Sequence, residues 1–164
     1  MSGRAADMPG LQRPAGGPVR PAAGAPARQR LVPYANPPAC TDGGSCVLDR
    51  WNFYQGQCTS WVAYRLNQLN GIAFSNSYGG SGTWGDATNW GPHARALGIA
   101  VNGTPVVGSV AWYSSGHVAY VEQVNSPTSI VISEMNYDFD NGFWVHTITT
   151  SGGWPTSFIH IADR

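Results

Sequence analysis

Hydrophobic and polar residues follow two different periods along the chain, a helical period first and a strand period after it. From Cys58 to Leu69, apolar side chains recur every three to four residues and Gly71 follows as a stop signal, which predicts an amphipathic helix. A second helix is predicted over residues 86–97. Gly91 and Pro92 weaken that prediction, because proline interrupts the hydrogen-bond ladder of a helix.

After Pro105 the apolar residues alternate with polar ones, which is the period of a β-strand. Turn-forming residues divide this region into predicted strands over residues 108–113, 118–124, 129–136, 143–150 and 157–161. Strands joined by such short turns pair antiparallel. The predicted class is therefore α+β, with N-terminal helices packed on an antiparallel sheet of about five to six strands.

The N-terminal segment differs from this pattern. Of the first 30 residues, 17 are Ala, Gly or Pro, and five Arg against one Asp give this segment a charge of +4. The other 134 residues carry four Arg and eight acids, a charge of −4, so the net charge of zero conceals an asymmetry. Such a segment buries too little apolar surface to offset its chain entropy. We expect residues 1–33 to be flexible, either as a plain linker or as a tail that docks on a partner or larger assembly, and residues 34–164 to fold as one domain.

The composition also excludes several classes of protein. The chain has 7 Trp, 7 Tyr and 5 Phe, too many aromatic residues for a disordered protein of 164 residues. No apolar run approaches the roughly 18 residues of a membrane helix, and the N-terminal segment lacks the apolar stretch of a secretory signal. The overall charge gives no reason to expect nucleic-acid binding. We therefore expect neither membrane insertion nor a nucleic-acid partner.

The cysteines number three, Cys40, Cys46 and Cys58. Cys40 and Cys46 flank Thr-Asp-Gly-Gly-Ser, a turn-forming segment that can bring two sulfur atoms together. The alternative is that all three cysteines are reduced, and the number of cysteines alone favours neither possibility. A zinc site is not expected, because no second pair of Cys or His has zinc-ligand spacing. We expect the Cys40–Cys46 disulfide to form, which implies an oxidising compartment and leaves Cys58 as the odd thiol.

Cys58 begins the first predicted helix, directly after a turn that contains Gly56. Backbone amides and the helix dipole favour an anion there, which increases the thiolate fraction of a cysteine. Core packing is the structural alternative for this residue.

Two other residues complete a possible catalytic group. His117 opens one predicted strand, and Glu134 shares a face with Ile130 and Ile132 on the next. A carboxylate in apolar surroundings needs a partner, and the His117 ring is suitable; a satisfied histidine at a strand end is the alternative. Glu122 points to the opposite face and is expected in solvent. Nucleophile, base and orienting carboxylate would then be Cys58, His117 and Glu134.

Five fragments in order resemble the CHAP domains, cysteine- and histidine-dependent amidohydrolases/peptidases with a papain-like core. The fragments are GQCTSWVA at 56–63, ATNW at 87–90, PVVGSVA at 105–111, GHVAYV at 116–121 and ISEMNY at 132–137. The resemblance covers roughly residues 50–162. It implies a papain-like fold, Cys58 as nucleophile, His117 as base, Glu134 as orienting residue and Asn136 as a supporting polar residue. It also implies cleavage of amide bonds in bacterial peptidoglycan, at the sugar–peptide junction or within the peptides.

Further site assignments follow from this mechanism. The backbone amide of Cys58 and the side chain of Gln57 would stabilise the oxyanion. Four aromatic residues are expected to wall a substrate groove, with ordinary core packing as the alternative: Trp84, Trp90, Trp112 and Tyr113. No cofactor or metal is expected, because residues 41–49 lack the spacing of the calcium loop that some relatives carry and offer too few oxygen ligands. One further departure is Gly108-Ser109-Val110, where CHAP domains often have Gly-Asp-Val.

The implied location is extracellular, at the cell wall, although this chain shows no signal peptide. A housekeeping hydrolase, a phage lysin and a toxin delivered by a secretion apparatus all stay open. Two other functions also stay open. One is a noncatalytic peptidoglycan-binding module, and the other is a different papain-like cysteine peptidase or acyltransferase. In the other large family of cell-wall cysteine endopeptidases the third site residue is usually a histidine, for which His146 and His160 are available.

Overall fold

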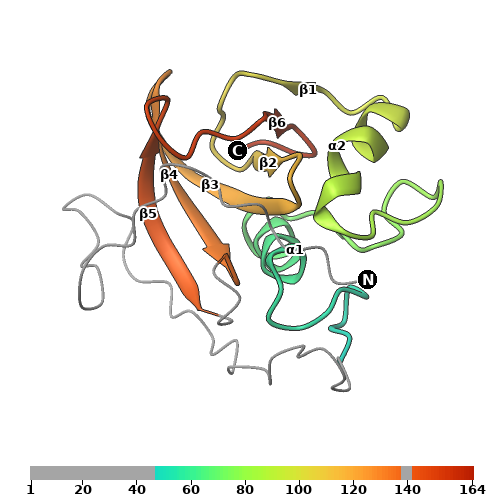
Figure 1. The fold of residues 1–164 in the computed structure, drawn as a ribbon. Helices are drawn as coiled ribbons and strands as arrows, with labels where there is room; N and C mark the ends of the chain where they lie inside the picture. Colours follow the sequence, from blue (N-terminus) through green and yellow to red (C-terminus); the bar gives the residue numbers. More distant parts are fainter. Residues whose placement is uncertain (1–46, 138–141) are drawn as a thin grey trace.

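The computed structural model describes residues 47–137 and 142–164. In these ranges two helices precede six strands (Figure 1): α1 (Cys58–Leu69), α2 (Ala87–Ala96), β1 (Val101–Asn102), β2 (Val110–Tyr113), β3 (His117–Ser126), β4 (Ser129–Met135), β5 (Phe143–Thr149) and β6 (Ser157–Ile159). The strands form a single antiparallel sheet in the order β1-β6-β2-β3-β4-β5. The predicted α+β class is confirmed, and β1 is the one strand of this sheet that the sequence pattern did not predict. Neither helix has the length and apolar character needed to cross a membrane.

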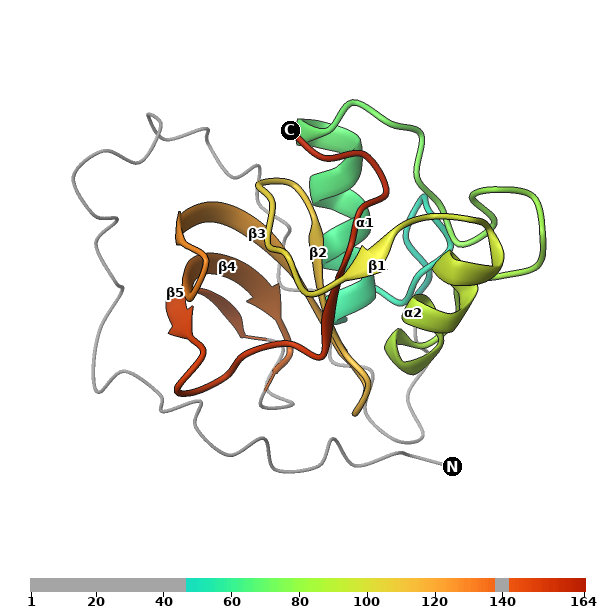
Figure 2. The ribbon, with the colours of Figure 1, turned by 90° about the horizontal axis from the view of Figure 1, so that it is seen from above.

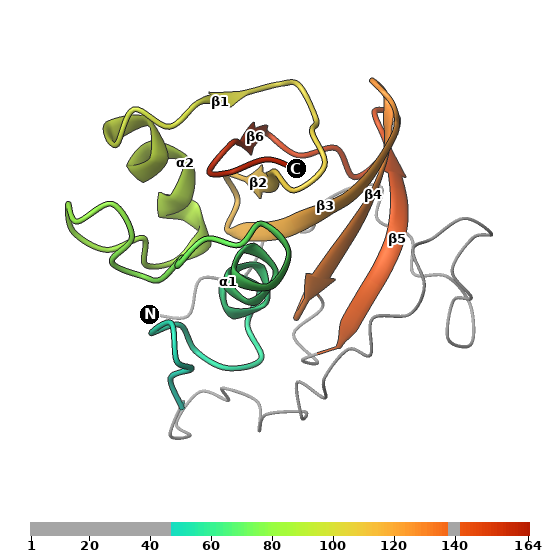
Figure 3. The ribbon, with the colours of Figure 1, turned by 180° about the vertical axis from the view of Figure 1, so that it is seen from behind.

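Helix α1 lies against β3 and β4, and the views of Figures 1 and 3 agree on this arrangement. Its buried face includes Trp61, Val62 and Leu66, which recur at helical spacing. Gly71 follows the helix with a φ of 68°, a left-handed conformation that glycine adopts without a steric penalty. Local pattern and local backbone chemistry therefore define the C-terminal end of α1.

Helix α2 forms in spite of Gly91 and Pro92, and its packing explains the glycine. A Cβ atom at Gly91 would lie 2.6 Å from Cη2 and Cζ3 of the Trp112 ring. The indole of Trp112 therefore packs directly on the helix backbone, and its Nε1 donates to the carbonyl oxygen of Ala87 at 2.7 Å. Tertiary packing of β2 against α2 outweighs the low helix propensity of this sequence.

Apolar side chains cover both faces of the sheet. Alternation along β3 sends Val118 and Tyr120 toward the helices and Ala119 and Val121 to the other face. The sheet is curved (Figure 2), and the second cluster packs on the face that alternates with the first. That cluster consists of Ala111, Tyr113, Ala119, Val121, Ile130, Ile132, Ile148 and Phe158. His117, the first residue of β3, shares this second face by the same alternation.

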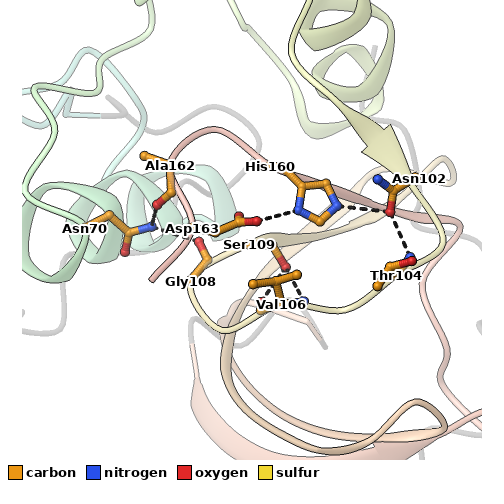
Figure 4. A network of polar contacts seen from close by, with 9 residues as sticks. All are labelled: Asn70, Asn102, Thr104, Val106, Gly108, Ser109, His160, Ala162 and Asp163. Atoms are coloured by element: carbon orange, nitrogen blue, oxygen red, sulfur yellow. Dashed lines mark hydrogen bonds and ion pairs between the residues drawn. The ribbon is translucent and has the colours of Figure 1, made fainter.

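The C-terminal segment is attached at the end of α1 that lies opposite Cys58 (Figure 4). Nδ2 of Asn70 donates to the carbonyl oxygens of Gly108 and Ala162, at 2.9 and 2.5 Å. Nδ1 of His160 lies 2.6 Å from a carboxylate oxygen of Asp163 in the same network. A helix of 12 residues separates Asn70 from Cys58 by roughly 18 Å of helix rise. His160 thus has a structural role in this network and is remote from Cys58.

Candidate active site

The turn before α1 positions Cys58 at the first residue of the helix. Gly56 adopts a φ of 77°, which reverses the chain, and Gln57 is the extended N-cap residue. The Gln57 side chain makes no capping hydrogen bond to the helix. Cys58 is half-buried and is a free cysteine. Its backbone N–H and its thiol both stand at the positive end of the helix dipole.

Asp49 fixes the approach to this turn. Its Oδ1 accepts hydrogen bonds from the backbone N–H groups of Trp51 and Phe53, at 2.8 and 3.0 Å. Its Oδ2 accepts from Oγ of Ser60, in the first turn of α1, at 2.5 Å. One carboxylate thereby ties the segment preceding the nucleophile position to the helix that carries it.

His117 and Glu134 are in contact, as expected from their strand positions. Nε2 of His117 lies 2.7 Å from Oε2 of Glu134, and the two residues are 4% and 1% exposed. Val121 is opposite Ile132 in the β3–β4 register, so counting along the strands makes His117 and Glu134 diagonal neighbours on one face. The buried carboxylate has the partner that its burial requires.

Cys58, at the start of α1, is close enough to His117 for its charge and its hydrogen bonding to act on the pKa of the histidine. Burial alone would lower the pKa of His117, but the charge and hydrogen bond of Cys58 and the contact with Glu134 outweigh it and raise this pKa to about 10. The arrangement favours the imidazolium form of His117.

Glu134 remains ionised in this environment. Burial raises the pKa of a carboxyl group, yet the hydrogen bond and charge of His117 and the contact with His146 lower the pKa of Glu134 to about 2. At neutral pH Glu134 is therefore negatively charged, in contact with the imidazole ring of His117.

Asn136 and Gln57 meet beside this group. Asn136 follows β4 with a φ of 57°, and its Nδ2 donates to Oε1 of Gln57 at 2.9 Å. This contact fixes which end of the Gln57 amide faces Asn136. The Nε2 group of Gln57 is therefore the end of the amide that does not face Asn136.

Two residues that contact the site were not assigned to it from the sequence. Nε2 of His146, on β5, lies 2.7 Å from Oε1 of Glu134. The Tyr137 ring meets the His117 ring edge to face, with centroids 5.4 Å apart and an interplanar angle of 78°. Strand alternation places His146 on one face of β5, but only the register, in which Ile132 is opposite His146, brings that face beside Glu134. Tyr137 lies beyond β4, where no periodic pattern applies.

The prediction that four aromatic residues line a substrate groove is wrong. The four side chains are buried in the core, with exposures of 0, 0, 5 and 3%: Trp84, Trp90, Trp112 and Tyr113. An indole can be buried when its N–H finds an acceptor. Nε1 of Trp84 donates to the carbonyl oxygen of Tyr78 at 3.0 Å, and Nε1 of Trp90 donates to that of Gly85 at 3.1 Å. Loop carbonyls satisfy these rings internally, so neither forms a groove wall.

The expectation for Glu122 is also wrong in part. It does point to the face opposite Glu134, but it is not in solvent. It forms an ion pair with Arg65 of α1 and accepts a hydrogen bond from Oγ of Ser133 at 2.6 Å. Glu122 thus links α1 to the sheet and takes no part in the His117 contact.

The proposed Cys40–Cys46 disulfide and the segment of residues 1–33 lie outside the described residues. Within residues 47–137 and 142–164, no cluster of three or more His, Cys, Asp or Glu side chains could hold a metal ion.

The comparisons with known proteins agree on one family. The CHAP domain model matches residues 48–136. The staphylococcal secretory antigens ssaA2 and SsaA of Staphylococcus aureus are each 40% identical over 114 residues, which are 66% of this chain. The crystal structure of an N-acetylmuramoyl-L-alanine amidase from Staphylococcus aureus is similar with a TM-score of 0.53 and 34% identity, covering 68% of this chain and 31% of that one. This chain spans 39% and 41% of the two antigens. With more than half of its residues matched by the family model, the chain belongs to the CHAP domain family.

Proposed function

We propose that this protein is a peptidoglycan hydrolase that cleaves amide bonds with Cys58 as nucleophile, His117 as acid and base, and Glu134 as orienting carboxylate. The observation that carries the proposal is the 2.7 Å contact between Nε2 of His117 and the buried Glu134 carboxylate, together with a free Cys58 whose charge acts on the same imidazole ring. Membership of the CHAP family and the similarity to an amidase structure support the same reaction. The scissile bond is that of an N-acetylmuramoyl-L-alanine amidase or of a peptidoglycan endopeptidase.

The resting site holds its proton on the imidazole ring. With a pKa of about 10, His117 is an imidazolium near neutral pH. The thiolate attacks the carbonyl carbon of the substrate amide, and a carbon–sulfur bond forms as the carbonyl electrons move to oxygen. Glu134 keeps the imidazolium oriented toward sulfur and substrate.

Two hydrogen-bond donors stabilise the resulting oxyanion. The backbone N–H of Cys58 is at the start of α1, and Nε2 of Gln57 is directed away from Asn136. Donors arranged in advance stabilise the charge that develops in the transition state without further reorganisation. Asn136 assists by orienting Gln57 and is a positioning residue in this scheme.

The reaction then divides into acylation and deacylation. The His117 imidazolium donates its proton to the leaving amine nitrogen, the carbon–nitrogen bond breaks, and a thioester to Cys58 remains. Neutral His117 then removes a proton from water, whose oxygen attacks the thioester. The products are a carboxylic acid and the regenerated thiol, so one water molecule is consumed for each amide bond.

The likeness to secretory antigens supports action outside the cytosol, on the cell wall. In this proposal residues 34–164 form the catalytic unit, and residues 1–33 are an extension that the chemistry does not require. Neither cofactor nor metal takes part in the steps above.

The test is digestion of purified peptidoglycan by the whole chain and by Cys58→Ala, with mass spectrometry of the released fragments. The wild type releases stem peptides with a free L-alanine amine if it is an amidase, or opens peptide bonds if it is an endopeptidase, and Cys58→Ala releases neither. Hydrolysis by Cys58→Ala would refute the mechanism. Peptidoglycan binding without cleavage, together with a Cys58 thiol that does not react with iodoacetamide at pH 7, would identify a binding module instead.

A further inference from the structure

The Glu134 carboxylate bridges two histidines that come from the two neighbouring strands. Oε2 is 2.7 Å from Nε2 of His117 on β3, and Oε1 is 2.7 Å from Nε2 of His146 on β5. The side chain of Glu134 is 1% exposed and that of His146 is 19% exposed. Each oxygen of one buried carboxylate thus has its own imidazole partner.

This geometry determines the proton on His146. A nitrogen lone pair at 2.7 Å from an anionic oxygen would be repelled, so Nε2 of His146 carries hydrogen. Nε2 makes no regular hydrogen bond with any described acceptor, and Oε1 of Glu134 is the oxygen at contact distance. The contact is therefore largely electrostatic, and it acts on the carboxylate that supports His117.

A carboxylate held by one oxygen can rotate about its last side-chain bond, whereas a carboxylate held by both cannot. We propose that His146 is a positioning residue of the active site, which holds Oε1 of Glu134 so that Oε2 stays directed at His117. The inference rests on the proposed catalytic roles of Cys58, His117 and Glu134. His146 itself touches neither the nucleophile nor the His117 ring in this arrangement.

The other titratable groups around Glu134 do not replace this contact. On β2, burial and next the Glu134 charge raise the pKa of Tyr113, but its hydroxyl donates to the carbonyl oxygen of Gly153 at 2.8 Å. The Tyr137 ring packs on His117, and the charge of Cys58 likewise acts on His117. Among the described residues, His146 is the cation-forming group on the Oε1 side.

The test measures the rate of Cys58 alkylation by iodoacetamide between pH 4 and 10, with the modified peptide quantified by mass spectrometry. This reaction reports the thiolate–imidazolium pair and requires no peptidoglycan. His146→Phe retains an aromatic ring without a donor, and we expect the acid limb of its alkylation profile to move to higher pH by about one unit, corresponding to a tenfold change in the equilibrium that forms the thiolate–imidazolium pair. His146→Gln, which restores an N–H donor, should return the profile to that of the wild type.

Activity on peptidoglycan provides a second readout. We expect His146→Phe to lower kcat about tenfold with KM unchanged, as for the loss of one contact to a charged group. His160→Phe is the matched control, because His160 also contacts a carboxylate but lies at the other end of α1. If His146→Phe does not fold, His146→Asn replaces it, since its shorter amide does not reach Oε1.

The outcomes are distinct. A His146→Phe profile equal to that of the wild type, or a His146→Gln profile shifted as far as that of His146→Phe, would overturn the inference. A shifted acid limb in a protein that cleaves no peptidoglycan would retain the role of His146 and refute the proposed function alone.

Discussion

Nδ2 of Asn136 donates to Oε1 of Gln57 at 2.9 Å, across 79 positions of sequence. Gln57 immediately precedes Cys58, and Asn136 lies two residues after Glu134. One hydrogen bond therefore connects the oxyanion side of the candidate site with the strand end that carries its carboxylate. The orientation of the Gln57 amide depends on this contact, because an amide turned by 180° would place a second donor, Nε2, opposite Nδ2 of Asn136.

Replacing Asn136 should impair catalysis through Gln57. We expect Gln57→Ala to lower kcat about 10²–10³-fold, as for the loss of one oxyanion donor. Asn136→Ala should lower it about 10–100-fold, because it misplaces that donor without removing it. The check is a double-mutant cycle in which Asn136→Ala has little further effect once Gln57 is alanine. Fully additive effects would show that Asn136 acts elsewhere.

Stability in acid should depend on Glu134. The pKa of this carboxyl group is lowered from 4.5 to about 2 in the folded protein, so the unfolded state binds the proton more readily. The contribution to the free energy of unfolding is fully present above pH 4.5 and is lost as pH falls toward 2. Both folded and unfolded states hold protonated His117 in this range, so His117 adds no slope of its own.

The measurement is urea denaturation of the wild type and Glu134→Gln at several pH values from 6 to 2. We expect the wild type to lose stability more steeply than the variant below pH 4.5. Parallel curves would mean that Glu134 is not ionised in the folded protein.

The contact between α2 and Trp112 predicts the effect of a larger residue at position 91. A Cβ at Gly91 would stand 2.6 Å from the indole ring, so Gly91→Ala should destabilise the fold by about 1–3 kcal/mol, as overpacking does. Gly103→Ala is the control, since a Cβ there meets nothing within 4 Å and Gly103 is not among the glycines with positive φ. Thermal unfolding of both variants checks the prediction. Equal melting temperatures would contradict it.

Chelation should leave the protein unaffected. Asp49, the acid of residues 41–49 that the structure describes, uses both carboxylate oxygens for hydrogen bonds to Trp51, Phe53 and Ser60. We expect EDTA to change neither the melting temperature nor the rate of peptidoglycan hydrolysis. Loss of activity that calcium restores would show that residues 41–49 bind a metal.

The two N-terminal cysteines should form a disulfide in the protein as it acts outside the cytosol. Its loop is short, so the expected stabilisation is only about 2 kcal/mol. Intact-mass measurement under non-reducing conditions should find one disulfide and one free thiol, and alkylation should label Cys58. Three free thiols in protein recovered from its native location would contradict both the bond and the extracellular assignment. A bridge that includes Cys58 would indicate an oxidised, inactive enzyme.

The secondary structure of this protein follows mostly from local sequence. The apolar spacing of α1 and the alternation of β2 through β6 depend on neighbours within one element, so periodicity predicted them. Strand β1 has only two residues, too few for a period to show. The sequence also predicted that Glu134 has a polar partner, because a carboxylate on an apolar strand face requires one wherever it lies.

Only the tertiary structure decided which partners each site residue has. The β4–β5 register brings His146 to the second oxygen of Glu134, and the end of β4 brings Asn136 to Gln57. The burial of Trp84 and Trp90 likewise depends on carbonyl groups that the folded loops supply. Local sequence determines which face a side chain takes within its own element. The groups that this face meets are determined by packing between segments far apart in the chain, where strand register and loop path are set by the whole core.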